Sequence, residues 1–249
     1  MNHFTTQKYW EEYYKNSSVQ KANIVSTVSA YDKYWDKLIK NNSNNPPKTI
    51  IEIGGYPGRY LAYLADKYNL IPTSLDFNSD RTMIEESMEV FNIKEYEIIQ
   101  ADIFKHQANK KYDIVISNGF IEHFENYQEV LNIHLNYLKD GGTALIMIPN
   151  MTYYINFYKL MVDKQNLSIH NLKCMELKTF TDFAKTNNLT IIENDYFGGF
   201  PFSVHEKNNF IQKIFFKTHR FIFKFFLNRI LINNPSKYFS GTIISIFKK

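Results

Sequence analysis

The sequence predicts an α/β protein whose core is a doubly wound, mostly parallel sheet. From residue 49 onward, short runs rich in β-branched residues alternate with segments of helical spacing. Because strands that alternate with helices are joined by right-handed crossovers, this pattern favours parallel pairing. The chain of 249 residues, 44% of them hydrophobic, can also bury the large core that such a sheet requires.

Residues 7–40 precede this pattern and carry aromatic and charged residues at helical spacing, so we expect two helices there. Residues 41–47 are a polar run that ends in two prolines. Because proline fixes φ and lacks an amide donor, this run predicts a linker. We divide the chain, taken as a single domain, into an N-terminal helical part (1–45), a central part (46–150) and a C-terminal half (151–249).

Seven strands and four helices are predicted after the linker. The strands are at residues 49–53, 71–75, 96–99, 112–117, 143–148, 189–196 and 241–247. The helices are at residues 58–68, 79–91, 126–138 and 175–187. Asp140, Gly141 and Gly142 predict a turn before the fifth strand. A helical insertion of about residues 197–239 separates the sixth strand from the seventh.

The composition excludes several kinds of protein. The single cysteine, Cys174, excludes a disulfide framework and a cysteine-based zinc or iron–sulfur site, and we expect no metal. The first 15 residues lack the apolar stretch of a secretory signal. No run approaches the ~18 uninterrupted apolar residues of a transmembrane helix. We therefore expect a cytoplasmic protein.

The excess of positive charge is concentrated in one segment. The chain has 29 Lys and Arg against 25 Asp and Glu, and residues 207–235 hold six basic residues, seven phenylalanines and no acidic residue. Three interpretations stay open: a helical cap on the sheet edge, a homodimer face or acceptor-pocket wall, and a helix in the membrane interface. The sequence favours the first and disfavours the membrane, and the charge itself does not argue for nucleic acid.

Glycines or acidic residues follow the first two predicted strands. Gly54, Gly55 and Gly58 come after the first strand, close to the Glu52 carboxylate. Their spacing is not GxGxxG, which disfavours a nicotinamide dinucleotide site. Asp76 ends the second strand, 18 residues after Gly58, about where a ribose diol would be held. A tight turn and a helix N-cap remain the alternatives.

Two further loops continue this series. Asp102 follows the third strand, where it could accept a hydrogen bond from an exocyclic amine, and Ile103 could pack on a base. A capping role is again the alternative. Asn118 and Gly119 follow the fourth strand as a small polar turn. In a doubly wound sheet such loops meet at the carboxyl edge, so we expect one ligand site there.

In this order, the four loops resemble class I S-adenosylmethionine-dependent methyltransferases of the small-molecule kind. The resemblance rests on residues 52–58, Asp76, Ala101-Asp102, 112–124 and 138–150. It extends loosely over residues 175–199. Tyr56 departs from the family, which usually has a glycine at this place. The resemblance implies a Rossmann-like sheet with an antiparallel last strand, an N-terminal helical lid, a cofactor-binding core over residues 46–150 and an acceptor-side half after it.

The resemblance also implies S-adenosyl-L-methionine as cofactor and S-adenosyl-L-homocysteine as product. The residues it places at the cofactor are Tyr14, Glu52, Gly54, Gly55, Gly58, Asp76, Phe77, Asp102, Ile103 and Asn118. Asp76 would hold the ribose hydroxyls and Asp102 the adenine amine, with Ile103 and Phe77 against the ring.

The remaining cofactor residues would lie around the methionine part. The glycines would let the loop pass it, Glu52 would anchor its ammonium group, and Asn118 would offer its backbone nearby. Tyr14 resembles the aromatic lid of relatives, and an aromatic core contact is the alternative for this residue.

Methyl transfer to a hydroxyl benefits from a base, and a histidine fits this role near neutral pH. His123 and His170 are the predicted catalytic residues, with structural roles as the alternative. The predicted acceptor-binding residues are Asn150, Tyr153, Tyr154 and His205. The turn after the fourth strand lacks the Pro-Pro-aromatic pattern of nucleic-acid amine methyltransferases, and Cys174 is misplaced for a cytosine-C5 enzyme. No nucleic-acid partner is therefore expected.

The leading hypothesis is an enzyme that O-methylates a small polar acceptor. A sugar-related or surface-polysaccharide (capsule) precursor is the expected class, with a phosphoryl-type oxygen as a variant. A lipophilic phenol or quinone precursor is the alternative acceptor, and an inactive cofactor-binding partner subunit is the alternative from another class.

Overall fold

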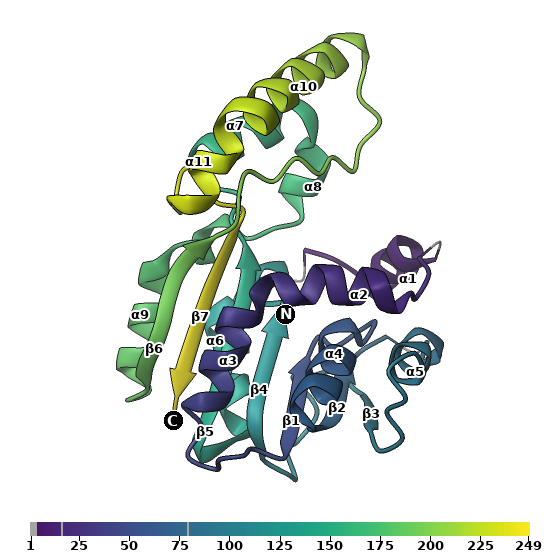
Figure 1. Ribbon diagram of the computed structural model, residues 1–249, viewed down its shortest axis with the longest axis vertical. Coiled ribbons are helices and arrows are strands. Elements are labelled where there is room, and N and C mark those ends of the chain that lie inside the picture. Colours follow the sequence, from purple (N-terminus) through teal and green to yellow (C-terminus); the bar gives the residue numbers. More distant parts are fainter. Residues whose placement is uncertain (1–3, 16, 79) are drawn as a thin grey trace.

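Seven strands form one sheet in the computed structural model, which describes residues 4–15, 17–78 and 80–249 (Figure 1). The strands lie in the order β3-β2-β1-β4-β5-β7-β6. Their bounds are β1 Thr49–Ile53, β2 Ile71–Asp76, β3 Glu97–Gln100, β4 Tyr112–Asn118, β5 Leu138–Pro149, β6 Thr190–Phe197 and β7 Thr242–Lys248. Neighbours pair in parallel except that β7 runs antiparallel to β5 and β6. The predicted Rossmann-like fold is confirmed.

The strand order reverses between β1 and β4. From β1 the chain steps outward to β2 and β3, and it then returns to pair β4 with the other side of β1. The loops that leave β1 and β4 therefore diverge and open a crevice at the carboxyl edge of the sheet. Both strands are almost wholly buried, as expected for a sheet covered on both faces.

Helices cover the two faces with separate apolar cores. One face carries α2 (Lys21–Val28), α3 (Asp32–Lys40), α4 (Arg59–Tyr68) and α5 (Thr82–Glu89), and the other carries α6 (Tyr127–Asn136) and α9 (Leu177–Thr186). Ile50 belongs to the first core and Ile51 to the second, because successive strand residues point to opposite faces.

Within the described part of residues 7–40, three α-helices form, and not the predicted two. α1 (Gln7–Tyr14) is separate from α2, and a short 3₁₀ turn at Ser29–Tyr31 precedes α3. The chain reaches α2 through Gln20, which has an extended backbone (φ −136°) that no continuous helix accepts. Residues 1–3 and 16 of the predicted N-terminal part, and residue 79 of the predicted helix 79–91, lie outside the described residues.

The predicted turn at residues 140–142 is instead part of β5. Gly141 has φ 75°, and the pairing of β4 with β5 shifts register between Tyr112 and Ile114. The extra residues form an irregularity within the strand, where glycine supplies the left-handed backbone. The amide of Lys249 donates to the Gly142 carbonyl at 3.0 Å, so pairing with the C-terminal segment continues the strand through this point.

The C-terminal half adds a group of helices at the carboxyl end of β5 (Figure 1). It contains α7 (Tyr153–Val162), α8 (Lys164–Ser168), α10 (Phe210–Ile222), a π-helical turn (Phe223–Leu227) and α11 (Asn228–Asn233). α10 packs on α7 around a third apolar core that includes Tyr158 and Phe223, rather than along the edge strand β6. Within the described residues, no helix is both long and apolar enough to cross a bilayer.

Candidate functional site

The loop from β1 to α4 depends on two glycines with left-handed backbone. Gly54 has φ 73° and Gly58 has φ 85°, a region that other residues rarely adopt. A Cβ atom on Gly54 would stand 2.3 Å from the Phe120 ring, which leaves no room for a side chain. The loop is thereby held against the turn that follows β4, and the two loops form adjoining walls.

Glu52 and Asn118 join the ends of β1 and β4 beneath this loop. The Asn118 amide donates to Glu52 Oε1 at 2.7 Å. Glu52 is buried, and desolvation raises the pKa of its carboxyl to about 8. Asn118 Oδ1 is also buried and has no hydrogen-bond partner among the described residues. A donor group on a bound molecule would satisfy this oxygen.

Asp76 organises the loop after β2. Its Oδ1 accepts from the Asn78 amide at 2.7 Å and its Oδ2 from the Tyr56 amide at 3.1 Å. Burial raises the pKa of this carboxyl, and the backbone hydrogen bonds oppose that shift. Asp76 does not cap a helix, because Arg81 precedes α5, and its carboxylate instead joins two loops. It also lines the adjoining cavity, and its contact with a ribose stays a prediction. Asn78 Nδ2 is a buried donor without a partner in the described part of the chain.

A cavity of about 240 Å³ runs along these strand ends. It is lined by predicted cofactor residues, namely Tyr14, Gly54, Asp76, Phe77, Asp102, Ile103 and Asn118. Asp102 Oδ1 accepts from the Phe104 amide at 3.0 Å, so this carboxylate also caps its own loop. Ile103 is buried and forms an apolar part of the cavity lining, whereas the Phe77 ring is exposed at the cavity's edge.

Helix α1 covers the point where this cavity meets a second one. The Phe4 amide donates to the His123 carbonyl at 2.9 Å, and the Trp10 ring meets the His123 ring edge-on with centroids 4.9 Å apart. Tyr14 packs on Tyr56 with ring centroids 5.0 Å apart. Trp10 and Tyr14 line both cavities, so α1 has the position of the predicted lid.

The second cavity measures about 340 Å³ and extends toward the C-terminal half. Its lining includes the remaining predicted cofactor residues, Glu52, Gly55 and Gly58. It also includes His123, His170 and His205, together with the aromatic residues Tyr9, Trp10, Tyr13 and Tyr31. The structure therefore brings all ten predicted cofactor residues and three of the predicted acceptor-side residues to two adjoining cavities.

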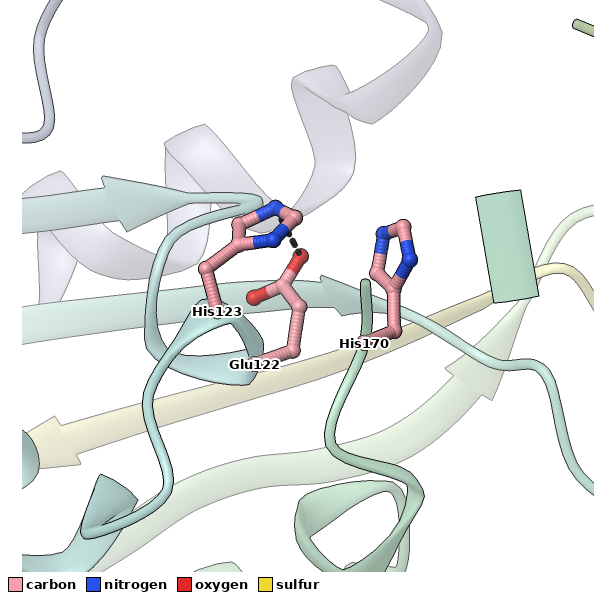
Figure 2. Close-up of side chains that lie close together, drawn as sticks. All are labelled: Glu122, His123 and His170. Atoms are coloured by element: carbon pink, nitrogen blue, oxygen red, sulfur yellow. Dashed lines mark ion pairs between the residues drawn. The ribbon is translucent and has the colours of Figure 1, made fainter. Parts of the chain in front are cut away.

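Glu122, His123 and His170 form the polar centre of the second cavity (Figure 2). Glu122 and His123 lie in the short 3₁₀ turn after β4, and His170 follows α8. Glu122 Oε1 is 3.9 Å from His123 Nε2, and the two imidazole centroids are 4.6 Å apart. Glu122 is buried, and its Oε2 has no hydrogen-bond partner among the described residues.

The two histidines are held in one tautomer. His123 Nδ1 lies 3.0 Å from the Ile169 carbonyl, and His170 Nδ1 lies 2.7 Å from the Asn166 carbonyl. A carbonyl only accepts, so each Nδ1 carries the proton and each Nε2 keeps a lone pair. Desolvation lowers the pKa of His123 to about 3 and that of His170 to about 4, whereas burial raises the pKa of Glu122 to about 8. At neutral pH the rings are uncharged.

These three residues could also hold a divalent metal ion. One ligand atom from each lies within 4.8 Å of the others. Neutral imidazoles whose Nδ1 donates to a backbone carbonyl are typical metal ligands. The same features suit a protonated or cationic ligand, so the geometry alone leaves both chemistries available.

His205 is held beside the second cavity by the buried Asp163 carboxylate. Its Nδ1 lies 3.1 Å from Asp163 Oδ2, and its amide donates to Asp163 Oδ1 at 2.8 Å. Lys159 Nζ donates to the same carboxylate at 2.8 Å and to the Ser203 carbonyl at 2.7 Å. These bonds hold the pKa of Asp163 well below its ordinary value, against the opposing effect of burial. They tie residues 203–205 to α7 and α8.

The other three predicted acceptor residues have partners outside the lining of both cavities. The Asn150 amide donates to the Lys237 and Ser240 carbonyls at 2.9 and 2.8 Å. Tyr153 stacks edge-on with Tyr238, with centroids 5.0 Å apart. Tyr154 packs on Phe223 within the third core. Their predicted acceptor contacts stay predictions, and in this structure the three residues join α7 to the segment before β7.

Sequence reasoning assigned no role to several residues of the second cavity. Glu122 is the most important of them, because its buried carboxyl lies beside His123 and His170 and burial raises its pKa to about 8. Its position directly before His123 was the available signal. Trp10 and Tyr13 lie one helical turn apart on α1, and that spacing could have placed them on the same face as Tyr14.

Comparison with known proteins places the chain in a family. Residues 28–193 match the family model described as "Methyltransferase domain". The chain is 30% identical over 105 residues to N-methyltransferase 4 of Papaver somniferum, and the aligned region covers 41% of this chain and 30% of the relative. It is 27% identical over 119 residues to (S)-tetrahydroprotoberberine N-methyltransferase of Eschscholzia californica, covering 47% of this chain and 34% of the relative. The chain thus spans about a third of these relatives.

Solved structures share the fold at low sequence identity. Coclaurine N-methyltransferase bound to N-methylheliamine and SAH superposes with a TM-score of 0.59 at 15% identity, covering 94% of this chain and 75% of that chain. A SAM-dependent methyltransferase from Archaeoglobus fulgidus gives 0.58 at 16% identity, covering 96% and 98%. The N-methyltransferase NodS from Bradyrhizobium japonicum, in complex with SAH, gives 0.57 at 10% identity, covering 96% and 97%.

Proposed function

The chain belongs to the methyltransferase domain family, and from this premise we propose that it is an S-adenosyl-L-methionine-dependent methyltransferase acting on a small-molecule amine. The observation that supports an amine is the buried Glu122 carboxyl in an aromatic-walled cavity, one oxygen of which has no hydrogen-bond partner among the described residues. Curated relatives and solved neighbours named as N-methyltransferases support the same class of acceptor.

The cavity along the strand ends fits the proposed cofactor. Asn118 Oδ1 and Asn78 Nδ2 are buried polar atoms that lack protein partners in the described residues, and both residues line this cavity. A nucleoside and an amino-acid group offer the complementary donors and acceptors. Asp76 would hold the ribose hydroxyls, Ile103 and Phe77 would pack on the base, and Glu52 would lie toward the ammonium end. When bound, S-adenosyl-L-methionine supplies a methyl group already activated on a positively charged sulfur.

Glu122 and the two histidines prepare the acceptor. The Glu122 carboxylate attracts an ammonium ion and takes its proton, which leaves the nitrogen lone pair free to react. With a pKa of about 8 the carboxyl is mostly protonated at neutral pH in the empty cavity. An entering ammonium ion lowers this pKa, so the carboxyl releases its proton to solvent before it takes one from the acceptor. His123 and His170 each present an Nε2 lone pair, which can accept a hydrogen bond from an N–H group of the acceptor and so orient the amine. Trp10 and Tyr13 offer aromatic faces to the positive charge of the product.

O-methylation of a sugar-related or surface-polysaccharide precursor stays the second proposal. The polar side of the second cavity, formed by Asn166, Ser203 and His205, favours a hydroxylated acceptor. A histidine with a pKa of about 3 is, however, a weak base for an alcohol. A phenol loses its proton more readily than an alcohol and could pack on the aromatic residues of the cavity, so a lipophilic phenol or quinone precursor stays the alternative acceptor. The cytoplasmic location and a homodimer remain predictions.

Binding and turnover test these proposals in sequence. Calorimetric titration with S-adenosyl-L-homocysteine is expected to show binding, and its absence would refute the cofactor. A panel of amines, sugar nucleotides and phenols is then screened for a mass gain of one methyl group. Amine turnover that is lost in Glu122→Gln while S-adenosyl-L-homocysteine still binds supports the first proposal. Turnover confined to hydroxyl acceptors, and lost in His123→Ala, would replace it with the second.

A further inference from the structure

The helices of the insertion expose an unusually large apolar surface. Phe210 is 77% exposed, Ile211 75% and Phe225 67%, and Phe221, Phe226 and Ile230 are each more than half exposed. The surface continues onto α7, which lies beside α10 through the Phe157–Phe215 ring contact and a 2.9 Å bond from the Gln212 side chain to the Met161 carbonyl. Contiguous apolar patches of this kind are rare on monomers and mark contact sites. We call this surface the apolar face.

The apolar residues of α10 form an inner stripe and an outer stripe along the helix. His219 and the half-buried Phe215 and Phe216 pack toward α7 and the third core. Phe210, Ile214 and Phe221 recur at intervals of four and seven residues on the outer side. The π-helical turn then presents Phe225, Phe226 and Leu227 in succession, all exposed. The residues of the apolar face therefore do not take part in packing α10 onto the rest of the chain.

A basic stripe runs beside the apolar face. Lys213, Lys217, Arg220 and Lys224 are exposed and recur at intervals of four, three and four residues. No acidic residue is present from residue 207 to residue 249. Lys213 and Arg220, together with Lys207, also line a hollow between α10 and residues 202–208. Glu206 lines the hollow as well, but its carboxylate is engaged by the Gln165 amide. The hollow thus has the charge to receive a phosphate group.

We propose that this surface docks on an anionic lipid bilayer. The apolar face enters the boundary between headgroups and acyl chains, and the basic stripe and hollow contact lipid phosphates, as in interfacial amphipathic helices. A second copy of the chain is a poorer occupant. A two-fold interface through this surface would bring two basic stripes close together, and residues 207–249 contain no acidic residue to offset them. The docked helices adjoin the segment before α10 that contributes Ser203 and His205 to the lining of the second cavity.

Co-sedimentation of the full chain with vesicles tests the proposal. Vesicles of phosphatidylcholine with about one third phosphatidylglycerol are expected to bind about tenfold more protein than pure phosphatidylcholine vesicles, and added salt should reduce the difference. Phe221→Gln/Phe225→Gln and Lys213→Glu/Lys217→Glu should each reduce binding about tenfold. Lys178→Glu/Lys185→Glu on α9 is the matched control, with the same charge change on exposed lysines elsewhere, and should bind as the unaltered chain does.

Each contrary outcome overturns the proposal. Equal binding to both vesicle types, or none, removes the anionic bilayer. Binding that inorganic phosphate abolishes, while Phe221→Gln/Phe225→Gln leaves it intact, assigns the hollow to a free phosphate. A concentration-dependent dimer that Phe221→Gln/Phe225→Gln dissociates assigns the apolar face to a second copy. The circular dichroism spectrum and urea midpoint of every variant are compared with those of the unaltered chain, because only folded variants count.

Discussion

Replacing Glu122 with glutamine is expected to stabilise the protein increasingly as the pH rises, while it impairs methyl transfer. The carboxyl is 1% exposed, and burial raises its pKa from 4.5 to about 8. The folded chain therefore keeps a proton that the unfolded chain releases above the ordinary pKa. Stability is fully present below that pKa and is lost as the pH rises toward the folded-state pKa. A neutral amide of the same shape cannot ionise, so it escapes this loss.

The size of the effect follows from the two pKa values. By linkage, the Glu122 carboxyl removes about 1 kcal/mol of stability at about pH 5 and about 5 kcal/mol at about pH 9. The free energy of unfolding of Glu122→Gln, relative to the unaltered chain, should therefore rise by about 4 kcal/mol between these pH values. An unpartnered buried amide costs about 1–3 kcal/mol at every pH. This constant cost shifts the difference in unfolding free energy by the same amount at every pH, so it does not change how that difference varies with pH.

Urea unfolding followed by circular dichroism, repeated across this pH range, measures the slope. Glu125→Gln is the matched control, because it makes the same substitution on the exposed neighbour in the chain. Glu52, which also has a pKa of about 8, is present in all three proteins and cancels in the comparison. A difference that does not change with pH would refute the reasoning. A difference of opposite slope would mean that a bound cation keeps the Glu122 carboxyl ionised.

Three further outcomes are expected. Asp163→Ala leaves the Lys159 ammonium buried without its 2.8 Å partner, and we expect the free energy of unfolding in urea to fall by about 3–5 kcal/mol; a loss within the error of the measurement would contradict this. Asp76→Ala removes the proposed ribose acceptor, and titration calorimetry should show S-adenosyl-L-homocysteine binding at least about tenfold more weakly. Excess EDTA should leave turnover unchanged, whereas a loss restored by zinc or manganese would assign Glu122, His123 and His170 to a metal site.

The sheet was largely predictable because each strand carries its own signal. The β-branched run at residues 49–53 coincides with β1, since a strand buried on both faces reads as a continuous apolar run. The last β-branched run is β7, within one residue of its predicted bounds. The glycine pair of β5 misled the prediction, because a turn and a bulge use the same left-handed backbone. Only pairing with the C-terminal segment decides between them, and that pairing is not local.

The acceptor side was less predictable because its properties arise from burial. Asn150 carries the same polar groups as a ligand-binding residue, and only the tertiary structure shows that two carbonyls occupy its amide. Glu122 resembles any surface glutamate in the sequence, yet its carboxyl is buried in the folded chain, and this burial raises its pKa. A pKa near neutral is a property of the assembled cavity, which no local pattern encodes.

The two halves of the site have different origins in the chain, and this difference bears on specificity. The cavity along the strand ends is lined by residues from the loops after β1, β2, β3 and β4 and from α1. The second cavity is lined in addition by residues of the C-terminal half, among them Asn166, Ser203 and His205. The family match ends at residue 193, before the segment that contains Ser203 and His205. Lys159 and Asp163 couple that segment to α7 and α8, so a change in the insertion can move the acceptor wall without disturbing the loops at the strand ends. We therefore expect acceptor choice to vary with the insertion and cofactor binding to remain a property of the sheet.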